Sequence, residues 1–83
     1  TMKEAIRDYV CRDLLLDDSL TIDDNENLLV TGVLDSLALM RLVMHLEDTY
    51  DIEIPPSEIT LENFASLTTM TGYLENRLGI QAA

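Results

Sequence analysis

The sequence predicts an all-α protein: a small four-helix bundle of three longer helices and one short helix. Three segments, residues 2–16, 36–50 and 67–78, carry apolar residues at the three-to-four-residue spacing of a helix face. The alternating segment at residues 51–54 has no second strand to pair with. A chain of 83 residues without internal repeats is the size of one domain with a small core, so we expect a single domain at residues 1–83.

The first helix is predicted to run from Met2 to Leu16 and to end at Asp17-Asp18-Ser19. Its apolar stripe consists of Ile6, Tyr9, Val10 and Leu14. Cys11 is predicted to be a small, partly buried side chain, because nothing near it in the sequence would activate a thiolate.

A long connection, residues 17–35, follows the first helix. We expect it to be ordered, because four apolar residues can pin it across the helices: Leu28, Leu29, Val33 and Leu34. Its acidic run, residues 23–26, lacks both the ligand spacing and the glycine of a calcium-binding loop. We therefore interpret this run as a solvated acidic loop.

The second helix follows the turn at Gly32, and Ser36 is interpreted as its first residue, with the hydroxyl free to cap backbone N–H groups. The inner face of the helix is predicted to consist of Leu39, Leu42, Val43, Leu46 and Tyr50. A second apolar stripe consists of Leu37, Met40 and Met44. A surface helix needs only one apolar stripe to pack on its core, so the second stripe is expected to be a contact surface.

After the second helix, residues 51–54 are predicted to form an extended link that places Ile52 and Ile54 in the core. Pro55-Pro56 suits the start of a short helix, predicted at Ser57–Leu61. Ser66 is expected to cap the last helix, and Gly79 to end it. The inward residues of that helix are predicted to be Leu67, Met70, Tyr73, Leu74 and Leu78, and residues 80–83 are expected to fray.

The composition excludes several classes of function. A formal net charge of −11 disfavours nucleic acid and anionic membrane as partners, and favours proteins with basic docking patches. One cysteine rules out an internal disulfide and suits a reducing compartment. No apolar run approaches the length of a membrane span, and the first residues lack the apolar region of a signal peptide. We expect a cytoplasmic monomer that does not insert into membranes.

Acidic residues gather on both sides of the second helix, seven of them from Asp13 to Asp35 and seven from Glu47 to Glu75, with no base within either run. Such runs fit a solvated surface or a docking surface, and both interpretations are kept.

The sequence offers no catalytic site and no metal site. Ser36 and the only histidine, His45, are nine residues apart on one predicted helix, or about 13 Å at a rise of about 1.5 Å per residue. A nucleophile and its base must lie within hydrogen-bond reach, so a Ser-His-Asp triad is excluded. No Cys/His cluster, glycine-rich phosphate loop or paired-carboxylate motif is present.

Asp35-Ser36-Leu37 resembles the Asp-Ser-Leu signature of the acyl carrier protein superfamily. The resemblance covers essentially the whole chain at matching spacing, through Leu42-Val43-Met44, Leu46-Glu47, Tyr50-Asp51, Glu53-Ile54-Pro55 and Asn63-Phe64-Ala65-Ser66-Leu67. The three-residue match alone would be weak, but together with the helix, the acidic balance and the length it identifies the chain as a discrete carrier of this type.

The resemblance implies that Ser36 carries 4′-phosphopantetheine through a phosphodiester, attached from coenzyme A by a phosphopantetheinyl transferase. The terminal thiol of the arm would hold an acyl or aminoacyl group as a thioester. A loading ligase and downstream transferases or synthases would be the partner enzymes, and the chain itself would be non-catalytic. Asp35 is expected to help position the transferase's metal and substrate, and Leu37 to offer an apolar contact beside the serine.

Partner docking is assigned to residues along and after the second helix: Met40, Arg41, Met44, Glu47, Asp48 and Ile54. Fatty-acid synthase carriers usually place acids early on the serine helix, where this chain has Ala38 and Arg41. The segments 32–37 and 63–67 are more similar to stand-alone aminoacyl and D-alanyl carriers or secondary-metabolism carriers. We therefore expect a dedicated pathway outside bulk fatty-acid synthesis. The alternative is an unmodified acidic adaptor that binds a partner through the stripe of Leu37, Met40 and Met44.

Overall fold

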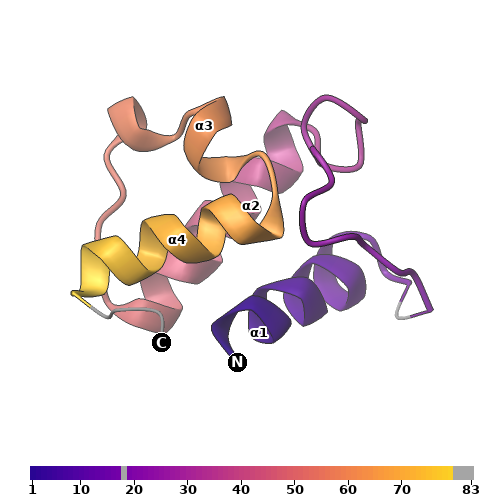
Figure 1. Ribbon diagram of the computed structural model, residues 1–83, viewed down its shortest axis with the longest axis horizontal. Helices are drawn as coiled ribbons and strands as arrows, with labels where there is room; N and C mark the ends of the chain where they lie inside the picture. The colour runs from indigo at the N-terminus through magenta and orange to yellow at the C-terminus, as the bar shows by residue number, and fades with distance from the viewer. Residues whose placement is uncertain (18, 80–83) are drawn as a thin grey trace.

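A computed structural model describes residues 1–17 and 19–79, and the regular secondary structure in these ranges consists of helices alone. Its elements are α1 (Met2–Tyr9), a π-helical turn η1 (Val10–Leu14), α2 (Ser36–Tyr50), a 3-10 turn η2 (Pro56–Glu58), α3 (Leu61–Phe64) and α4 (Leu67–Leu78). Figure 1 shows α4 passing in front of α2, with α1 below them and the short α3 above. The predicted bundle of three longer helices and one short helix is confirmed.

One core receives side chains from every α-helix. The predicted core residues Leu42, Leu46, Ile54 and Leu74 are all buried, and Phe64 of α3 is completely covered. The remaining buried apolar residues are Ile6, Val10, Cys11, Ile22, Leu28, Leu34, Val43, Leu67 and Met70. Ile22 was not expected in this core, since a lone isoleucine in a polar connection shows no periodicity. Cys11 is buried more deeply than predicted.

The first helix changes its hydrogen bonding halfway along. The backbone N–H of Leu15 donates to the carbonyl of Val10 over 2.9 Å, a five-residue spacing that defines the π turn. The helix ends at Leu14, two residues before the predicted end at Leu16: Leu15 is its C-cap, and Leu16 takes the left-handed conformation with φ of 54°. Asp18, predicted to help end this helix, lies outside the described residues.

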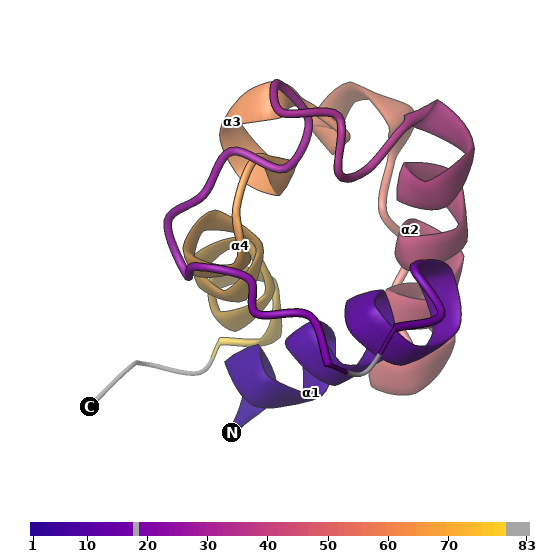
Figure 2. The ribbon, with the colours of Figure 1, turned by 90° about the vertical axis from the view of Figure 1, so that its right-hand side faces the viewer.

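The long connection ties the bundle together and is ordered, as expected. It runs past α4 and α3 before it reaches α2 (Figure 2). Two backbone bonds hold it there: the N–H of Leu28 donates to the carbonyl of Ala65 over 2.6 Å, and the N–H of Thr68 donates to the carbonyl of Asp24 over 3.1 Å. The Asp24 carboxylate also binds Lys3 and Arg7 of α1. The prediction of a merely solvated acidic loop is therefore wrong at Asp24.

The predicted short helix at Ser57–Leu61 is wrong, because two separate elements occupy this region. Pro56–Glu58 forms a single 3-10 turn, and Ile59 leaves the helical conformation with ψ of 76°. Thr60 then begins α3, since its side chain accepts a hydrogen bond from the backbone N–H of Asn63. Thr60, a residue type favoured at helix N-caps, was the missed indication of a helix start.

The last helix begins and ends as predicted. Ser66 accepts from the N–H of Thr69, and the Thr69 hydroxyl accepts from the N–H of Ser66, which closes a capping box. Gly79 ends the helix in the left-handed conformation. Residues 80–83, expected to fray, lie outside the described residues. Among residues 1–17 and 19–79, none of the helices combines the length and the apolar character that crossing a bilayer requires.

Candidate functional site

The start of α2 is capped by Asp35 and not by Ser36. Asp35 is extended, and its Oδ1 accepts a hydrogen bond of 2.8 Å from the backbone N–H of Ala38. An aspartate at this position satisfies an otherwise unpaired N–H group and places negative charge at the positive end of the helix dipole. Ser36 is the first residue of the helix, as predicted, but the expectation that its hydroxyl caps the helix is wrong.

Ser36 is exposed, and its hydroxyl forms no hydrogen bond to any of residues 1–17 and 19–79. The backbone before it is fixed, because the N–H of Leu34 donates to the carbonyl of Leu28 over 2.9 Å and the Leu34 side chain is buried. Gly32, with φ of 82°, makes the turn that leads into this segment. The serine oxygen therefore stands at a defined point outside the first turn of α2.

The first turn of α2 suits a phosphate group on Ser36. Unpaired N–H groups and the helix dipole favour an anion at a helix N-terminus. A hollow of about 150 Å³, here called the proximal hollow, lies beside the serine and is lined by Leu14, Asp35, Leu37, Ala38 and Arg41. The free hydroxyl, the helix start and the nearby guanidinium together fit a covalent phosphodiester.

The second apolar stripe of α2 is exposed, as predicted. Leu37 is 65% exposed, Met40 46% and Met44 61%, whereas Leu42, Val43 and Leu46 on the other face are buried. Three exposed large apolar side chains on one helix, one of them next to Ser36, form a contact surface of the kind that protein partners cover.

Two of the predicted docking residues, Glu47 and Ile54, make contacts within the protein itself. Ile54 is only 5% exposed, so a partner cannot reach it, and its assignment to docking is wrong. The Glu47 carboxylate accepts a hydrogen bond of 2.8 Å from the backbone N–H of Ile54. This bond fixes the link after α2 and leaves Arg41 and Asp48 as the exposed charged residues of the predicted docking set.

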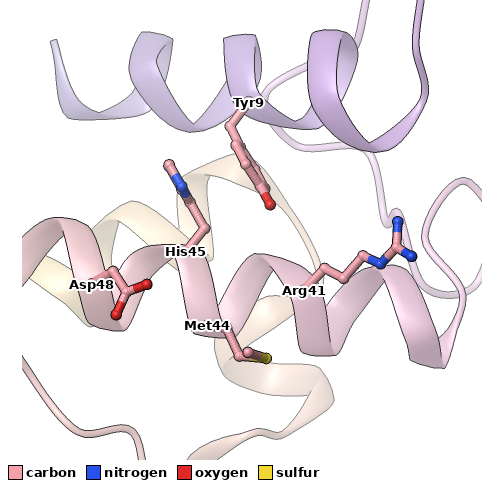
Figure 3. A pocket seen from close by; sticks show the side chains of 5 residues that line it. All are labelled: Tyr9, Arg41, Met44, His45 and Asp48. Carbon is pink, nitrogen blue, oxygen red and sulfur yellow. The ribbon is translucent and has the colours of Figure 1, made fainter.

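A second, larger hollow of about 280 Å³, here called the distal hollow, lies further along α2 and is lined by Tyr9, Arg41, Met44, His45 and Asp48. Figure 3 shows Tyr9 reaching from α1 toward α2, and His45 reaching back toward α1. Their rings stack with centroids 3.7 Å apart and planes at 7°. His45 is thus half-buried against Tyr9.

No group of three or more His, Cys, Asp or Glu side chains within residues 1–17 and 19–79 is placed to hold a metal ion. The stacking on Tyr9 engages His45 far from Ser36, as the spacing along the helix required. Burial raises the pKa of the Cys11 thiol, so this cysteine stays protonated and is a poor nucleophile. The arrangement presents a hydroxyl for modification and does not itself supply an acid or a base.

Comparison with known proteins agrees with this geometry. Residues 4–74 match the family described as "Phosphopantetheine attachment site". The chain is 34% identical over 71 residues to aminoacyl carrier protein 2 of Bradyrhizobium diazoefficiens, covering 84% of this chain and 80% of that protein. It is 39% identical over 64 residues to the D-alanyl carrier protein of Streptococcus uberis, covering 77% and 78%. The D-alanyl carrier protein of Lactococcus lactis subsp. cremoris is 29% identical over 76 residues, covering 92% and 95%.

Proposed function

The chain belongs to the phosphopantetheine-attachment family of acyl carrier proteins, and we propose that Ser36 is the residue that bears its arm. The members of this family are carriers that act with partner enzymes such as ligases and transferases, and are not themselves catalysts. The cofactor is covalent 4′-phosphopantetheine, whose terminal thiol, when bound, holds the cargo as a thioester.

The free, exposed hydroxyl of Ser36 carries this proposal. The chain has three other serines: Ser19, Ser57 and Ser66. Ser19 donates its hydroxyl hydrogen to Asp17 over 2.5 Å, and Ser66 is buried within its capping box. Ser57 lies in the middle of the 3-10 turn η2, outside any α-helix N-terminus. Ser36 alone joins exposure, a helix start and the Asp-Ser-Leu sequence.

Attachment requires a phosphopantetheinyl transferase and coenzyme A. The Ser36 oxygen forms a new bond to the phosphorus that bears pantetheine, and the pyrophosphate bond of coenzyme A breaks. Adenosine 3′,5′-bisphosphate leaves, and a base of the transferase takes the hydroxyl proton. Since Oδ1 of Asp35 is engaged by Ala38, we assign the other carboxylate oxygen of Asp35 to the transferase's metal.

We propose that the cargo is an aminoacyl group in a pathway outside bulk fatty-acid synthesis. Support comes from the names of the similar proteins, which are aminoacyl and D-alanyl carriers. An aminoacyl-loading ligase and a downstream transferase or synthase would then contact the exposed stripe of Leu37, Met40 and Met44. The charged neighbours Arg41 and Asp48 would set the orientation of these partners. We expect one carrier domain that works as a monomer in the cytoplasm, where a free, buried Cys11 stays reduced.

Intact mass spectrometry tests the attachment site. The wild type, Ser36→Ala and Ser66→Ala are each incubated with coenzyme A and a broad-specificity transferase. The wild type and Ser66→Ala should each gain one phosphopantetheine, and Ser36→Ala should gain none. An adduct on Ser36→Ala would contradict the proposal. So would an unmodified wild type under conditions that modify a known carrier, which is the result expected of an adaptor that takes no arm.

A further inference from the structure

The proximal and distal hollows lie one after the other along α2 and share Arg41. The first helix forms the opposite wall: Leu14 of η1 lines the hollow beside Ser36, and Tyr9 of α1 lines the hollow further along α2. The first helix therefore runs antiparallel to α2. The two hollows meet at Arg41 and are here together called the groove: its near end is lined by the two neighbours of Ser36, Asp35 and Leu37, and its far end by Asp48.

We propose that this groove seats the loaded arm of the same chain, and that Asp48 receives the α-ammonium group of an aminoacyl cargo. The inference rests on the proposed function, because it needs an arm on Ser36. The inference goes further because it assigns a binding site to the arm on the same chain and a residue that recognises the cargo.

The length of the groove matches the length of the arm. Ser36 and Asp48 are twelve residues apart on α2, or about 18 Å at about 1.5 Å per residue. From the serine oxygen to the α-nitrogen of an aminoacyl thioester there are about 17 bonds. At the roughly 3.5 Å per three bonds of an extended backbone, these bonds span about 20 Å. Ser36 and Asp48 also lie about 120° apart around the helix, so an arm that leaves Ser36 must cross the surface of α2 to enter the groove. Nearly fully extended, it is long enough to bring the cargo's nitrogen level with Asp48.

The charged and apolar residues of the groove occur in the same order as the phosphate, the apolar segment and the ammonium group of the loaded arm. Near Ser36, the start of α2 and the Arg41 guanidinium suit the phosphate. Further along, the stacked rings of Tyr9 and His45 and the thioether of Met44 offer apolar surface for the arm's methyl and methylene groups. At the far end, the Asp48 carboxylate complements an ammonium group.

Arg41 and Asp48, the charged residues of the groove that would bind the phosphate and the ammonium group, form no ion pairs within the described part of the chain. Arg41 and Asp48 lie on one face of α2, seven residues apart, and both are exposed. Neither forms an ion pair within the described part of the chain, where the bridges involve only Thr1, Lys3, Glu4, Arg7, Asp24, Glu58 and Arg77. The Asp48 carboxylate is exposed and forms no ion pair with the described residues, so it suits a cargo that brings its own positive charge.

The test uses the whole chain loaded on Ser36 with a hydrolysis-resistant arm in which an amide replaces the thioester. One sample carries an alanyl group, which has the ammonium, and a matched sample carries an acetyl group, which lacks it. Both are compared with the unmodified chain by two-dimensional NMR of backbone amides and ring protons. Asp48→Asn is the test variant, and Glu62→Gln is the matched control because Glu62 is an exposed acid on α3, away from the groove.

Both arms should shift the ring protons of Tyr9 and His45, and nuclear Overhauser contacts should join these rings to the arm's methyl groups. The alanyl arm alone should further shift the backbone N–H of Asp48. This difference between alanyl and acetyl should disappear in Asp48→Asn, persist in Glu62→Gln and shrink when salt is added, because exposed charges are screened.

Shifts confined to the residues beside Ser36 would mean that the arm moves freely in solvent, and would overturn the inference while leaving the proposed function standing. Identical shifts at Asp48 from both cargoes, or an alanyl effect that survives in Asp48→Asn, would overturn the role of Asp48. A chain that accepts no arm at all overturns the proposed function, and this inference with it.

Discussion

The protein contains two Ser-Leu pairs at helix starts, and they have opposite environments. Ser66, before α4, is 5% exposed and closes a capping box with Thr69. Ser36, at the start of α2, is exposed, and the capping is done by Asp35. The two serines therefore share a residue type but differ in position by one residue, since Ser66 is the N-cap of α4 and Ser36 is the first residue of α2.

The difference shows how a helix start becomes available for chemistry. A serine that caps a helix holds its oxygen against backbone N–H groups, and modification would cost the helix that bond. When an aspartate one residue earlier takes over the cap, the serine moves one place into the helix and its oxygen points to solvent. At the start of α2 Asp35 takes the cap and Ser36 stays exposed, whereas Ser66 caps α4 itself and is also buried.

The largest expected effect is the complete presence or absence of phosphopantetheine on a variant. It tests whether Ser66 escapes modification because it is buried or because it lacks the Asp-Ser-Leu sequence. Ala65→Asp gives the second site the Asp-Ser-Leu sequence, and Ser36→Ala removes the first site. The double variant should gain no phosphopantetheine, because the Ser66 hydroxyl remains buried and engaged by Thr69. Intact mass after treatment with transferase and coenzyme A is the measurement.

The matched control is Ala65→Asp with Ser36 present, which should gain one arm and no more. Circular dichroism checks that both variants fold, since Ala65 is half-buried and its carbonyl accepts from Leu28. An arm on the double variant would show that the three-residue sequence alone is sufficient and that the contrast in burial is irrelevant.

The next effect is on stability. Ser66→Ala should lower the free energy of unfolding by about 1–2 kcal/mol, because it removes a helix cap in a buried position. In a domain of this size that corresponds to a fall in melting temperature of roughly 4–16 °C. Denaturant unfolding followed by circular dichroism measures it. A change under about 0.3 kcal/mol would mean that the capping box contributes little to the stability of α4.

Asp35→Ala comes third, with an expected loss of about 1 kcal/mol, typical of an exposed N-cap. Asp35→Asn is the matched control, since asparagine caps about as well as aspartate while removing the charge. It should unfold within a few tenths of a kcal/mol of the wild type. Equal losses in the two variants would show that the charge of Asp35, and not its hydrogen bond to Ala38, stabilises the start of α2.

The helical periodicity of the sequence predicted most of the fold, since apolar residues spaced for one helix face must pack together. It predicted α2, α4 and the core contributions of Leu42, Leu46 and Leu74 correctly. It failed where local hydrogen bonds decide the conformation. The π turn after Tyr9 and the break at Ile59 leave no trace in apolar spacing.

The candidate site likewise has features that the sequence predicted and features that it did not. Ser36 and the exposed stripe followed from the sequence, because a motif and a surplus apolar stripe are local properties. The stacking of Tyr9 on His45 did not, because the two residues are 36 positions apart and meet only when α1 packs against α2. The same holds for the bond between the Glu47 carboxylate and the backbone N–H of Ile54, which joins α2 to the link that follows it.

The smallest expected effect is the sharpest test of the contrast between the two serines: the stability change of Ser36→Ala. A serine cap would lose about 1 kcal/mol on this substitution, as Ser66 should. Ser36 lies inside the helix, makes no hydrogen bond within residues 1–17 and 19–79, and is replaced by the residue with the best helix propensity. The free energy of unfolding should therefore change by less than about 0.5 kcal/mol, in either direction. Thermal and urea unfolding of the wild type, Ser36→Ala and Ser66→Ala, all without the arm, give the comparison. A loss for Ser36→Ala as large as that for Ser66→Ala would mean that Ser36 shares the capping with Asp35. Its oxygen would then have to leave a helix bond before it could accept phosphopantetheine.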